Sequence, residues 1–407
     1  DHRVKGNRPV GEKVFMQGGV CYNRAVPLAM AALTGRRIVV PPDPGLIGAF
    51  GVALEVRRRM DLGLMAPGCF SLETLRDRQL EYGKPFICDG GREKCDRKCE
   101  IARIRIEGRI YPFGGACNRW YNLRSGTDVH SEGINLAARF EKRVFAGAAV
   151  PAEPGRRPSV GINKSFMVNT YFPLYERFFR NLGFDVVLPG EPDLEGMKRR
   201  NAPFCYPAEI AHGYFQNLLE KNPDYLFLPL FQGDYLPGGT GRSSTCPICQ
   251  GEPFYLAAAF QDHRVWRDRK ASGRVLNPNL NFSGGIESAG ENLLDLSGTL
   301  GVPRRKIRAA FREAAAVQEQ VLRETREDAA AFLSRLEKDP DAFAVVLFGR
   351  TYNAFVSEAH KGIPGKFASR SIPVIPCNGI AFEGEDPMDG MYWSAGKRIL
   401  GAARFVA

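Results

Sequence analysis

The second half of the chain alternates between two spacings of apolar residues. Short apolar runs at 159–165, 184–190 and 225–231 predict strands. The stretches 171–183 and 207–222 instead repeat apolar residues every three or four positions and predict helices. Strands that alternate with helices indicate βαβ units and a mainly parallel sheet, so this half is predicted to be α/β.

A long, Ala-rich, charged helix is predicted over 304–337, after which the α/β pattern restarts. Apolar runs at 343–349 and 371–377 predict the first strands of a further lobe. We therefore expect two Rossmann-like, parallel-sheet lobes joined by helices, one at 158–340 and one that begins at 341–407.

The N-terminal residues 1–64 show a shorter α/β pattern. A strand at 13–20 is predicted to end in the Gly-Gly turn of Gly18 and Gly19, and helix 23–33 and strand 37–40 follow. The predicted helix 23–33 has one apolar face, made by Ala25, Leu28, Ala29 and Ala32. Residues 45–59 form a second helix rich in Gly and Ala, which is typical of a helix packed closely on a sheet.

Residues 65–157 have a different character. They hold a group of cysteines and one alternating strand, "IARIRIEGRI". A polar stretch follows near 125–132, and the proline-rich segment 151–158 has no apolar periodicity and is predicted to be a linker. We interpret 65–157 as a small Cys-rich bridge.

Composition narrows the class of protein. The chain has 407 residues, 44% of them hydrophobic, which is ample for real cores. No apolar run approaches the roughly 20 residues of a membrane helix, and no export signal is visible at the start, so we expect a cytoplasmic protein without a membrane partner. The chain begins without Met, and we interpret it as a piece of a longer polypeptide.

The net charge of +11 comes from Lys and Arg that are scattered among 45 acidic residues. This pattern favours a solvated basic surface over a nucleic-acid site. The alternative reading is attraction for phosphorylated ligands such as nucleotides or coenzyme A.

The first cysteine group predicts a metal site. Cys88, Cys95, Cys99 and Cys117 are separated by six, three and seventeen residues, and the pairs Gly90-Gly91 and Gly114-Gly115 lie next to the cysteines. Four thiolates complete a tetrahedral site for zinc or an iron–sulfur cluster, and the spacing does not discriminate between them. The alternative is four unrelated buried thiols.

A second, dispersed set of cysteines follows predicted strands or precedes helices. It comprises Cys205, Cys246 and Cys377, with Cys249 of "TCPIC" as the alternative to Cys246. Such positions meet at the carboxyl edge of a parallel sheet, and three thiolates there would suit a cubane cluster with one open iron. A helix start also lowers the pKa of cysteine, so we expect Cys205 to favour the thiolate. The alternatives are a zinc or redox pair for "CPIC" and core packing for Cys377.

Other candidates are weaker. His212 is a possible proton donor, although a hydrogen-bonded structural His explains it as well. Arg350, Tyr352 and Asn353 follow a predicted strand directly and would lie at the ligand edge of the sheet, or simply form an ordinary turn. No GxxxxGK[ST] phosphate loop is present, so a sugar-kinase-like phosphotransferase is not supported.

These motifs, in this order, resemble the large activase-related proteins of 2-hydroxyacyl-CoA dehydratases. "FMQGGVCYNRAV" and "IVVPPDPGLIGAFGVAL" are similar to the end of a sugar-kinase/actin-type ATPase domain, and "CDGGREKCDRKCEI" with "FGGACNRW" to the cysteine segment that follows it. "VGINKSFMVNTYFPLYERFFRNLGFDVVLP", "CYPAEIAHG", "DYLFLP" and "TCPICQ" resemble the central DUF2229-type domain. "VVLFGRTYNAF", "IPVIPCNGIAF" and "MYW" resemble the dehydratase-subunit-like lobe.

The resemblance implies an iron–sulfur, ATP-coupled electron-transfer component that passes low-potential electrons to a CoA thioester or another difficult substrate. It implies a 4Fe-4S cluster, ATP with Mg in the full-length protein, and Gly18 and Gly19 beside the adenosine. Expected partners are the rest of the polypeptide, an electron donor such as ferredoxin or flavodoxin, an acyl-CoA and a second copy of the chain as a homo-oligomer.

Two departures from the family pattern stand out. The family's cysteine segment begins with a closer pair than Cys88 and Cys95, and its phosphate-binding turns belong upstream of residue 1, so the chain alone is expected to lack ATPase activity. The alternative function, of a different class, is a zinc-stabilised, non-catalytic scaffold that docks a partner enzyme.

Overall fold

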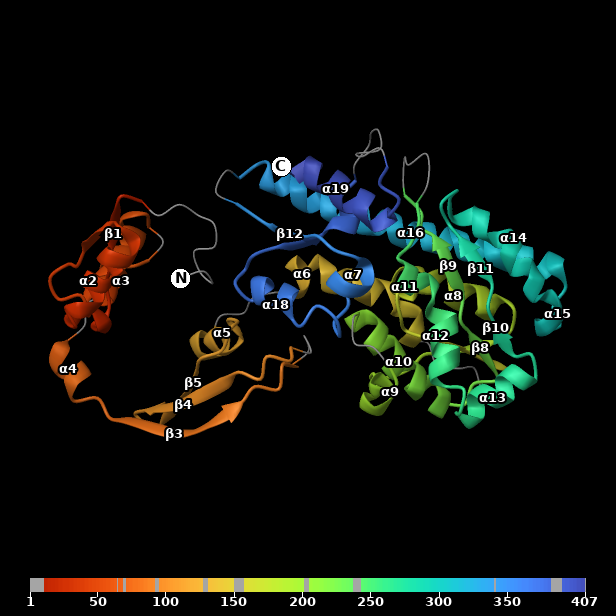
Figure 1. Ribbon diagram of the computed structural model, residues 1–407, viewed down its shortest axis with the longest axis horizontal. Helices are drawn as coiled ribbons and strands as arrows, with labels where there is room; N and C mark the ends of the chain where they lie inside the picture. The colour runs from red at the N-terminus through yellow and green to blue at the C-terminus, as the bar shows by residue number, and fades with distance from the viewer. Residues whose placement is uncertain are drawn as a thin grey trace. The chain divides into compact units, whose positions relative to one another are not determined.

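The computed structural model describes residues 11–63, 65–68, 71–91, 95–126, 131–149, 157–200, 205–236, 243–339, 342–381 and 390–406. Cys69 lies outside these ranges. The chain divides into two compact units, 1–79 and 80–407, whose elements are labelled in Figure 1. Within the described residues, no helix has both the length and the apolar composition needed to cross a membrane.

The first unit is a small α/β arrangement. Its elements are β1 (Lys13–Phe15), η1 (Gly19–Tyr22), α2 (Ala25–Thr34), β2 (Arg37–Val39), α3 (Ile47–Asp61) and α4 (Leu72–Arg76). Strands β1 and β2 pair in parallel, as expected for a strand–helix–strand unit. The order of strand and helix predicted for residues 13–59 is therefore confirmed.

The helices of this unit do not pack as the sequence suggested. Neither α2 nor α3 has a buried residue, and Leu28 on the predicted apolar face of α2 is 70% exposed. A Cβ built on Gly48 or Gly51 of α3 would meet nothing within 4 Å, so the expected close packing of this helix on a sheet is absent from the described residues of this unit. Two paired strands offer too little surface to cover both helices.

The second unit contains a four-stranded sheet of order β10-β8-β6-β7, in which every pair is parallel. Its strands are β6 (Ser159–Ile162), β7 (Asp185–Val187), β8 (Tyr225–Phe227) and β10 (Val275–Leu276). The helices that connect them are α8 (Val168–Asn181), α9 (Leu194–Lys198), α10 (Tyr206–Glu220), α11 (Pro247–Gln250), α12 (Glu252–Ala259) and α13 (Arg264–Ala271). The predicted α/β class with Rossmann-like parallel sheets is confirmed.

One predicted strand, 225–231, is divided in the structure. Residues 225–227 form β8, whereas Leu230–Gly233 forms β9 and pairs in parallel with β11 (Asn279–Asn281) in a separate two-stranded sheet. Pro229 stands between the two strands. Proline has no amide hydrogen for a strand ladder, which explains the break.

Helices cover the four-stranded sheet on both faces. Phe227 of β8 packs in the same cluster as Tyr175 and Phe179 of α8. Its neighbours Leu226 and Leu228 point the other way, into a second cluster with α10 and α13. Because strand side chains alternate between faces, β8 is apolar on both sides, as is typical of a buried parallel strand.

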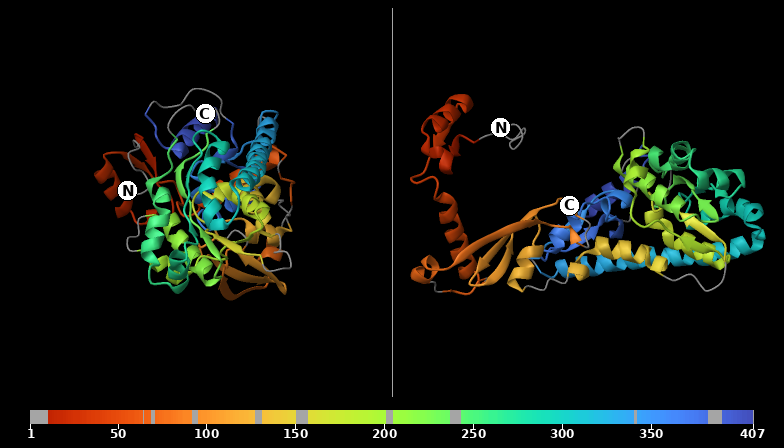
Figure 2. Two further views of the ribbon diagram at one scale, coloured as in Figure 1. Left: turned by 90° about the vertical axis from the view of Figure 1, so that its right-hand side faces the viewer. Right: turned by 90° about the horizontal axis from the view of Figure 1, so that it is seen from below.

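Helix α16 (Arg304–Leu336) is the long helix predicted at 304–337. It packs along α8 and also contacts α14 (Gly290–Leu293) and η6 (Cys377–Gly379), so it runs along the unit, as Figure 2 shows. The short elements before it are η4 (Ile286–Ala289), η5 (Leu294–Leu296) and α15 (Ser297–Leu300).

The C-terminal elements restart the α/β pattern as predicted. They are β12 (Val345–Leu347), α17 (Thr351–Ala354), α18 (Ile363–Ala368), β13 (Val374–Pro376), η6 and α19 (Ser394–Val406). Strands β12 and β13 pair in parallel. Tyr352, Ile375 and Ala402 share the core of α8, so the described residues of this lobe pack into the same core as the four-stranded sheet.

The cysteine-rich segment forms an antiparallel sheet of order β3-β4-β5, followed by α5 (Arg119–Ser125). The strands are β3 (Leu80–Ile87), β4 (Glu100–Ile106) and β5 (Arg109–Phe113). We call residues 80–126 the cysteine module and residues 131–406 the α/β body.

The structure divides the predicted bridge at 65–157 differently. Helices α6 (Ser131–Ile134) and α7 (Leu136–Val144) and the turn η3 (Ala146–Ala149) follow the cysteine module. Helix α7 packs on α8 and β13, and its Phe140 is buried in the main core, so these elements belong to the α/β body.

Replacement of Phe179 by Ala should destabilise the second unit. Phe179 is fully buried and packs against the rings of Phe178, Phe184 and Phe227. We expect a loss of about 3–5 kcal/mol in the free energy of unfolding, measured by urea denaturation. Phe254→Ala is the matched control, because Phe254 is 67% exposed, and it should shift stability by less than about 0.5 kcal/mol.

Candidate functional site

The four cysteines of the first group line one small cavity in the cysteine module. Cys88 follows β3, Cys99 precedes β4 and Cys117 follows β5, while Cys95 lies in the connection between β3 and β4. All four thiols border a cavity of about 40 Å³. The amide of Cys88 donates a hydrogen bond of 2.8 Å to the carbonyl of Cys99, which ties the two ends of that connection together.

Glycine is required where the chain passes Cys95. Gly90 has a φ of +86°, and a Cβ at this position would lie 2.2 Å from the carbonyl oxygen of Cys95. Gly362, in the α/β body, has a φ of +69°, and its Cβ would lie 2.8 Å from the Cβ of Cys95. Cys95 is therefore enclosed by backbone on two sides, where no side chain fits.

Basic side chains surround the same cavity. Arg97, Lys98, Arg119 and Lys366 contribute to its lining. Arg119 donates a hydrogen bond of 3.0 Å to Asp89, and its Nη1 lies 3.9 Å from the sulfur of Cys88. The guanidinium of Arg119 beside Asp89 lowers the pKa of that carboxyl below its usual value.

The four cysteines line one cavity, but they do not form a closed ligand set. No three His, Cys, Asp or Glu side chains in the described ranges are placed so that they could hold a metal ion. The convergence agrees with the spacing argument, and the donor set suits zinc or iron. Metal binding at Cys88, Cys95, Cys99 and Cys117 therefore stays a prediction.

The second cysteine set is only partly brought together. Cys205 precedes α10 and Cys246 precedes α11, and both thiols lie near the guanidinium of Arg350 and near the half-buried ring of Tyr255. Cys246 also lines a cavity of about 30 Å³ with Gly349 and Arg350. The structure thus groups Cys205 and Cys246 around Arg350.

Cys377 and Cys249 lie in the core. Both thiols are fully buried, and that of Cys377 donates to the carbonyl of Gly349 at 3.7 Å. Gly349 lines the small cavity together with Cys246. Cys377 contacts Gly349 but does not line that cavity itself. A cluster shared by Cys205, Cys246 and Cys377, with Cys249 as the alternative, stays a prediction.

The expectation that Cys205 favours the thiolate is wrong. Burial raises the pKa of Cys205, and neither its hydrogen bond from Ala208 nor the charge of Arg350 reverses this. Burial also raises the pKa of Cys249 and of Cys377. In this structure, desolvation of the thiols outweighs the effect of a helix start.

The remaining candidate residues, His212, Tyr352 and Asn353, differ in how deeply they are buried. His212 is buried, its Nδ1 lies 2.7 Å from the carbonyl of Ala208, and its ring stacks on Tyr255. Burial lowers the pKa of His212, which supports the structural reading. Tyr352 is also buried and packs edge-on against Phe166, whereas Asn353 is exposed.

Sequence reasoning missed a buried carboxyl group near the second cysteine set. Glu252, at the start of α12, is 4% exposed and accepts hydrogen bonds from Asn163 and Ser165, which follow β6. Burial raises the pKa of Glu252 to about 7, and these hydrogen bonds only partly oppose the shift. The polar residues directly after the strand were the available signal, because buried polar groups there need a partner.

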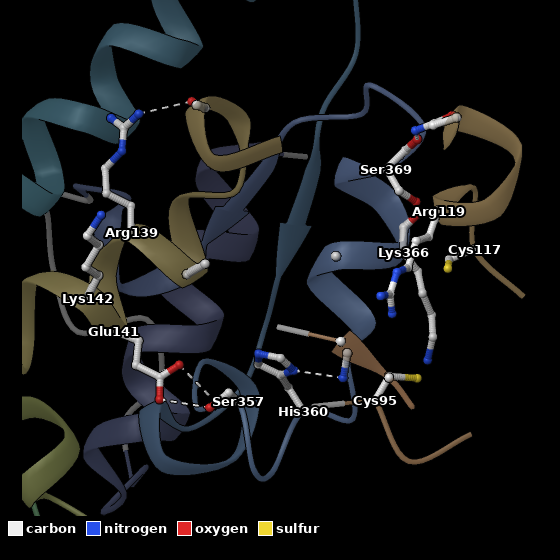
Figure 3. Close-up of a pocket in the computed structure, with 17 residues that line it drawn as sticks. Cys95, Cys117, Arg119, Arg139, Glu141, Lys142, Ser357, His360, Lys366 and Ser369 are labelled. Atoms are coloured by element: carbon white, nitrogen blue, oxygen red, sulfur yellow. Dashed lines mark hydrogen bonds between the residues drawn. The ribbon is translucent and has the colours of Figure 1, made fainter. Parts of the chain in front are cut away.

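Sequence reasoning also missed the large cavity shown in Figure 3. It has a volume of about 790 Å³ and lies between the cysteine module and the α/β body. Arg119, Arg139, Lys142 and Lys366 line it, together with Glu141 and His360. The residues that line this cavity come from segments more than 200 positions apart in the sequence, so no local sequence pattern predicts the cavity.

A partly buried ionic network adjoins one wall of this cavity, at Glu141. Glu141 of α7 accepts hydrogen bonds from the amide and the hydroxyl of Ser357, both at 3.2 Å, and Figure 3 shows this contact. Lys164 lies 3.6 Å from Glu141 and 3.3 Å from Glu358. The ammonium group of Lys164 is thus shared by two carboxyl groups. Burial raises the pKa of Glu141, and the charge of Lys164 opposes that shift.

The comparisons with known proteins identify one domain. Residues 159–380, more than half of the chain, match the family described as the CoA enzyme activase uncharacterised domain (DUF2229). The match runs from β6 to the end of η6 and includes Cys205, Cys246, Cys249 and Cys377. No curated protein and no solved structure matches the chain.

The raised pKa of Glu252 predicts a pH-dependent stability. Because the folded state holds this proton up to about pH 7 and the unfolded state loses it near 4.5, stability is greatest below pH 4.5 and falls as the pH rises to 7. We expect the free energy of unfolding to fall by about 2–3 kcal/mol more between pH 5 and pH 8 in the wild type than in Glu252→Gln. Urea denaturation at both pH values measures this, and equal slopes for the two proteins would refute the assignment.

Proposed function

The chain belongs to the family defined by the CoA enzyme activase uncharacterised domain, and from this membership we propose that it is an iron–sulfur electron-transfer component of a CoA enzyme activase system. The observation that carries the proposal is the convergence of Cys88, Cys95, Cys99 and Cys117 on one cavity. Four thiolates are the usual ligands of such clusters. When bound, a cluster supplies one-electron transfer at low potential.

The surroundings of the four thiols support this role. The backbone at Gly90 and Gly362 packs closely against Cys95 on two sides and holds this residue at the edge of the cavity. Binding of a metal would draw the four sulfurs together, and the free energy of binding would add to the stability of the cysteine module. Arg97, Lys98 and Arg119 would offset the negative charge of a metal held by four thiolates.

The family domain supplies the second part of the proposal. Cys205 and Cys246, grouped around Arg350, are the thiols of this domain best placed to bind a second cofactor, with Cys377 and Cys249 behind them. Coupling to ATP and a CoA thioester as the substrate follow from the resemblance. In that scheme Gly18, whose φ of +100° only glycine adopts easily, would approach the adenosine together with Gly19.

A zinc-stabilised scaffold is the second candidate function. The small size of the cavity and its four thiols favour it, because structural zinc sites are closed tetrahedra without an open position. In that case the cysteine module would hold its shape through the metal, and the α/β body would dock a partner enzyme.

Anaerobic purification followed by metal analysis tests the proposal. We expect a brown protein with broad visible absorbance and about four iron atoms for each cluster. Cys99→Ser should lose more than about half of the iron of the module site and should expose residues 85–120 to protease, because metal binding there contributes folding energy.

Cys21→Ala is the matched control, since Cys21 is buried in the first unit and does not line the cavity. It should retain the metal content of the wild type. Stoichiometric zinc in a colourless protein would favour the scaffold, and unchanged metal content in Cys99→Ser would refute both candidates.

A further inference from the structure

We propose that the large cavity between the cysteine module and the α/β body binds a diphosphate-bearing small molecule, held by Lys142 and Lys366. This inference does not depend on the proposed electron transfer. Cavities that bind small molecules commonly span about 300–1,000 Å³, and this one measures about 790 Å³.

Some of the cationic side chains that line the cavity are paired with a carboxylate, and others are not. Arg139 is paired with Asp328 at 2.9 Å and Arg119 with Asp89 at 3.0 Å, so their charges are largely compensated. Among the residues that the structure describes, no carboxylate forms an ion pair with Lys142 or Lys366. The ammonium group of Lys366 donates one hydrogen bond of 3.0 Å to the carbonyl of Lys361, and a lysine has three such donors, so neither charge is neutralised by a carboxylate.

The two lysines approach the cavity from different walls. Lys142 lies on α7, whereas Lys366 lies on α18, and Figure 3 shows them on opposite sides. An ionised diphosphate carries more oxygens than a single phosphate and can therefore meet more donors of the cavity. Ionised phosphate oxygens form short, charge-assisted hydrogen bonds with lysine, which makes this ligand class the best match.

Two other titratable groups beside the two lysines are Glu141 and His360. Burial raises the pKa of Glu141, and its carboxyl group shares the ammonium group of Lys164 with Glu358, so its charge is partly compensated. The Nδ1 of His360 accepts a hydrogen bond of 3.1 Å from the amide of Gly362, which places the proton of the neutral ring on Nε2. Burial lowers the pKa of His360 to about 4, so the ring is neutral at pH 7 and remains a donor.

Glycines extend the site. Gly90, Gly91, Gly133, Gly362 and Gly365 line the cavity, and their small size lets a ligand approach the backbone closely. The cavity also shares Cys95 and Cys117 with the four-thiol cavity. A ligand bound here would lie directly beside the thiols.

Isothermal titration with pyrophosphate, ADP and adenosine tests the proposal. We expect ADP and pyrophosphate to bind and adenosine to give no heat. Lys142→Gln and Lys366→Gln should each weaken ADP binding about five- to tenfold, and Lys366→Arg should restore it. Lys306→Gln is the matched control, because Lys306 is an exposed lysine on α16 outside the cavity.

Comparison of the titrations with ADP and with pyrophosphate also distinguishes a nucleotide from an inorganic diphosphate as the ligand. ADP binding that is tighter than pyrophosphate binding supports a nucleotide, and equal affinities support an inorganic diphosphate. Binding of adenosine with the affinity of ADP, or equal weakening in Lys306→Gln, would overturn the proposal. Metal content measured on the same samples keeps a failure of the proposed electron-transfer role distinct from a failure of anion binding.

Discussion

The second unit depends on the burial of helix α8. Eleven of its fourteen residues are buried, with the parallel sheet on one side and α16 on another. The fully buried Gln318 of α16 donates a hydrogen bond of 3.0 Å to the carbonyl of Thr170, so a polar contact joins the two helices within the core. Tyr171 donates to Asp234 at 2.7 Å, and Asp234 in turn pairs with Arg398 of α19. One helix thus fixes the sheet, the long helix and the last helix relative to one another.

The cysteine module is positioned by a few polar contacts with the α/β body. Asn122 donates to the carbonyl of Ser369 at 2.8 Å, and Arg370 donates to that of Ala116 at 2.9 Å. Lys361 pairs with Asp96 at 2.8 Å. These contacts surround the four-thiol cavity and the large cavity together, so order gained at the thiols would also shape the neighbouring anion site. Metal binding and ligand binding are therefore expected to influence one another through the wall that they share.

The sequence predicts the helices and strands well, but it predicts less well the properties that depend on residues distant in the sequence, such as burial, pKa shifts and long-range contacts. The spacing of apolar residues identified α8, α10 and α16 because each helix has its own periodic face. The spacing of the four cysteines predicts a metal site, and the four residues line one cavity because they adjoin the strands of one small sheet, but metal binding itself stays a prediction. The effect of the helix start on Cys205 was also a local argument, but burial by distant residues reversed it. The contact between Glu141 and Ser357 joins residues 216 positions apart in the sequence, and the spacing of apolar residues cannot predict such a long-range pair.

The central claim is that the thiols of the cysteine module hold a metal. Metal-edge X-ray absorption on the anaerobically purified protein tests it most directly, in a variant with Cys205 and Cys246 both replaced by Ala. The account predicts a first shell made of sulfur alone at about 2.3 Å. A shell of nitrogen and oxygen ligands, or a protein that retains no metal, would contradict it.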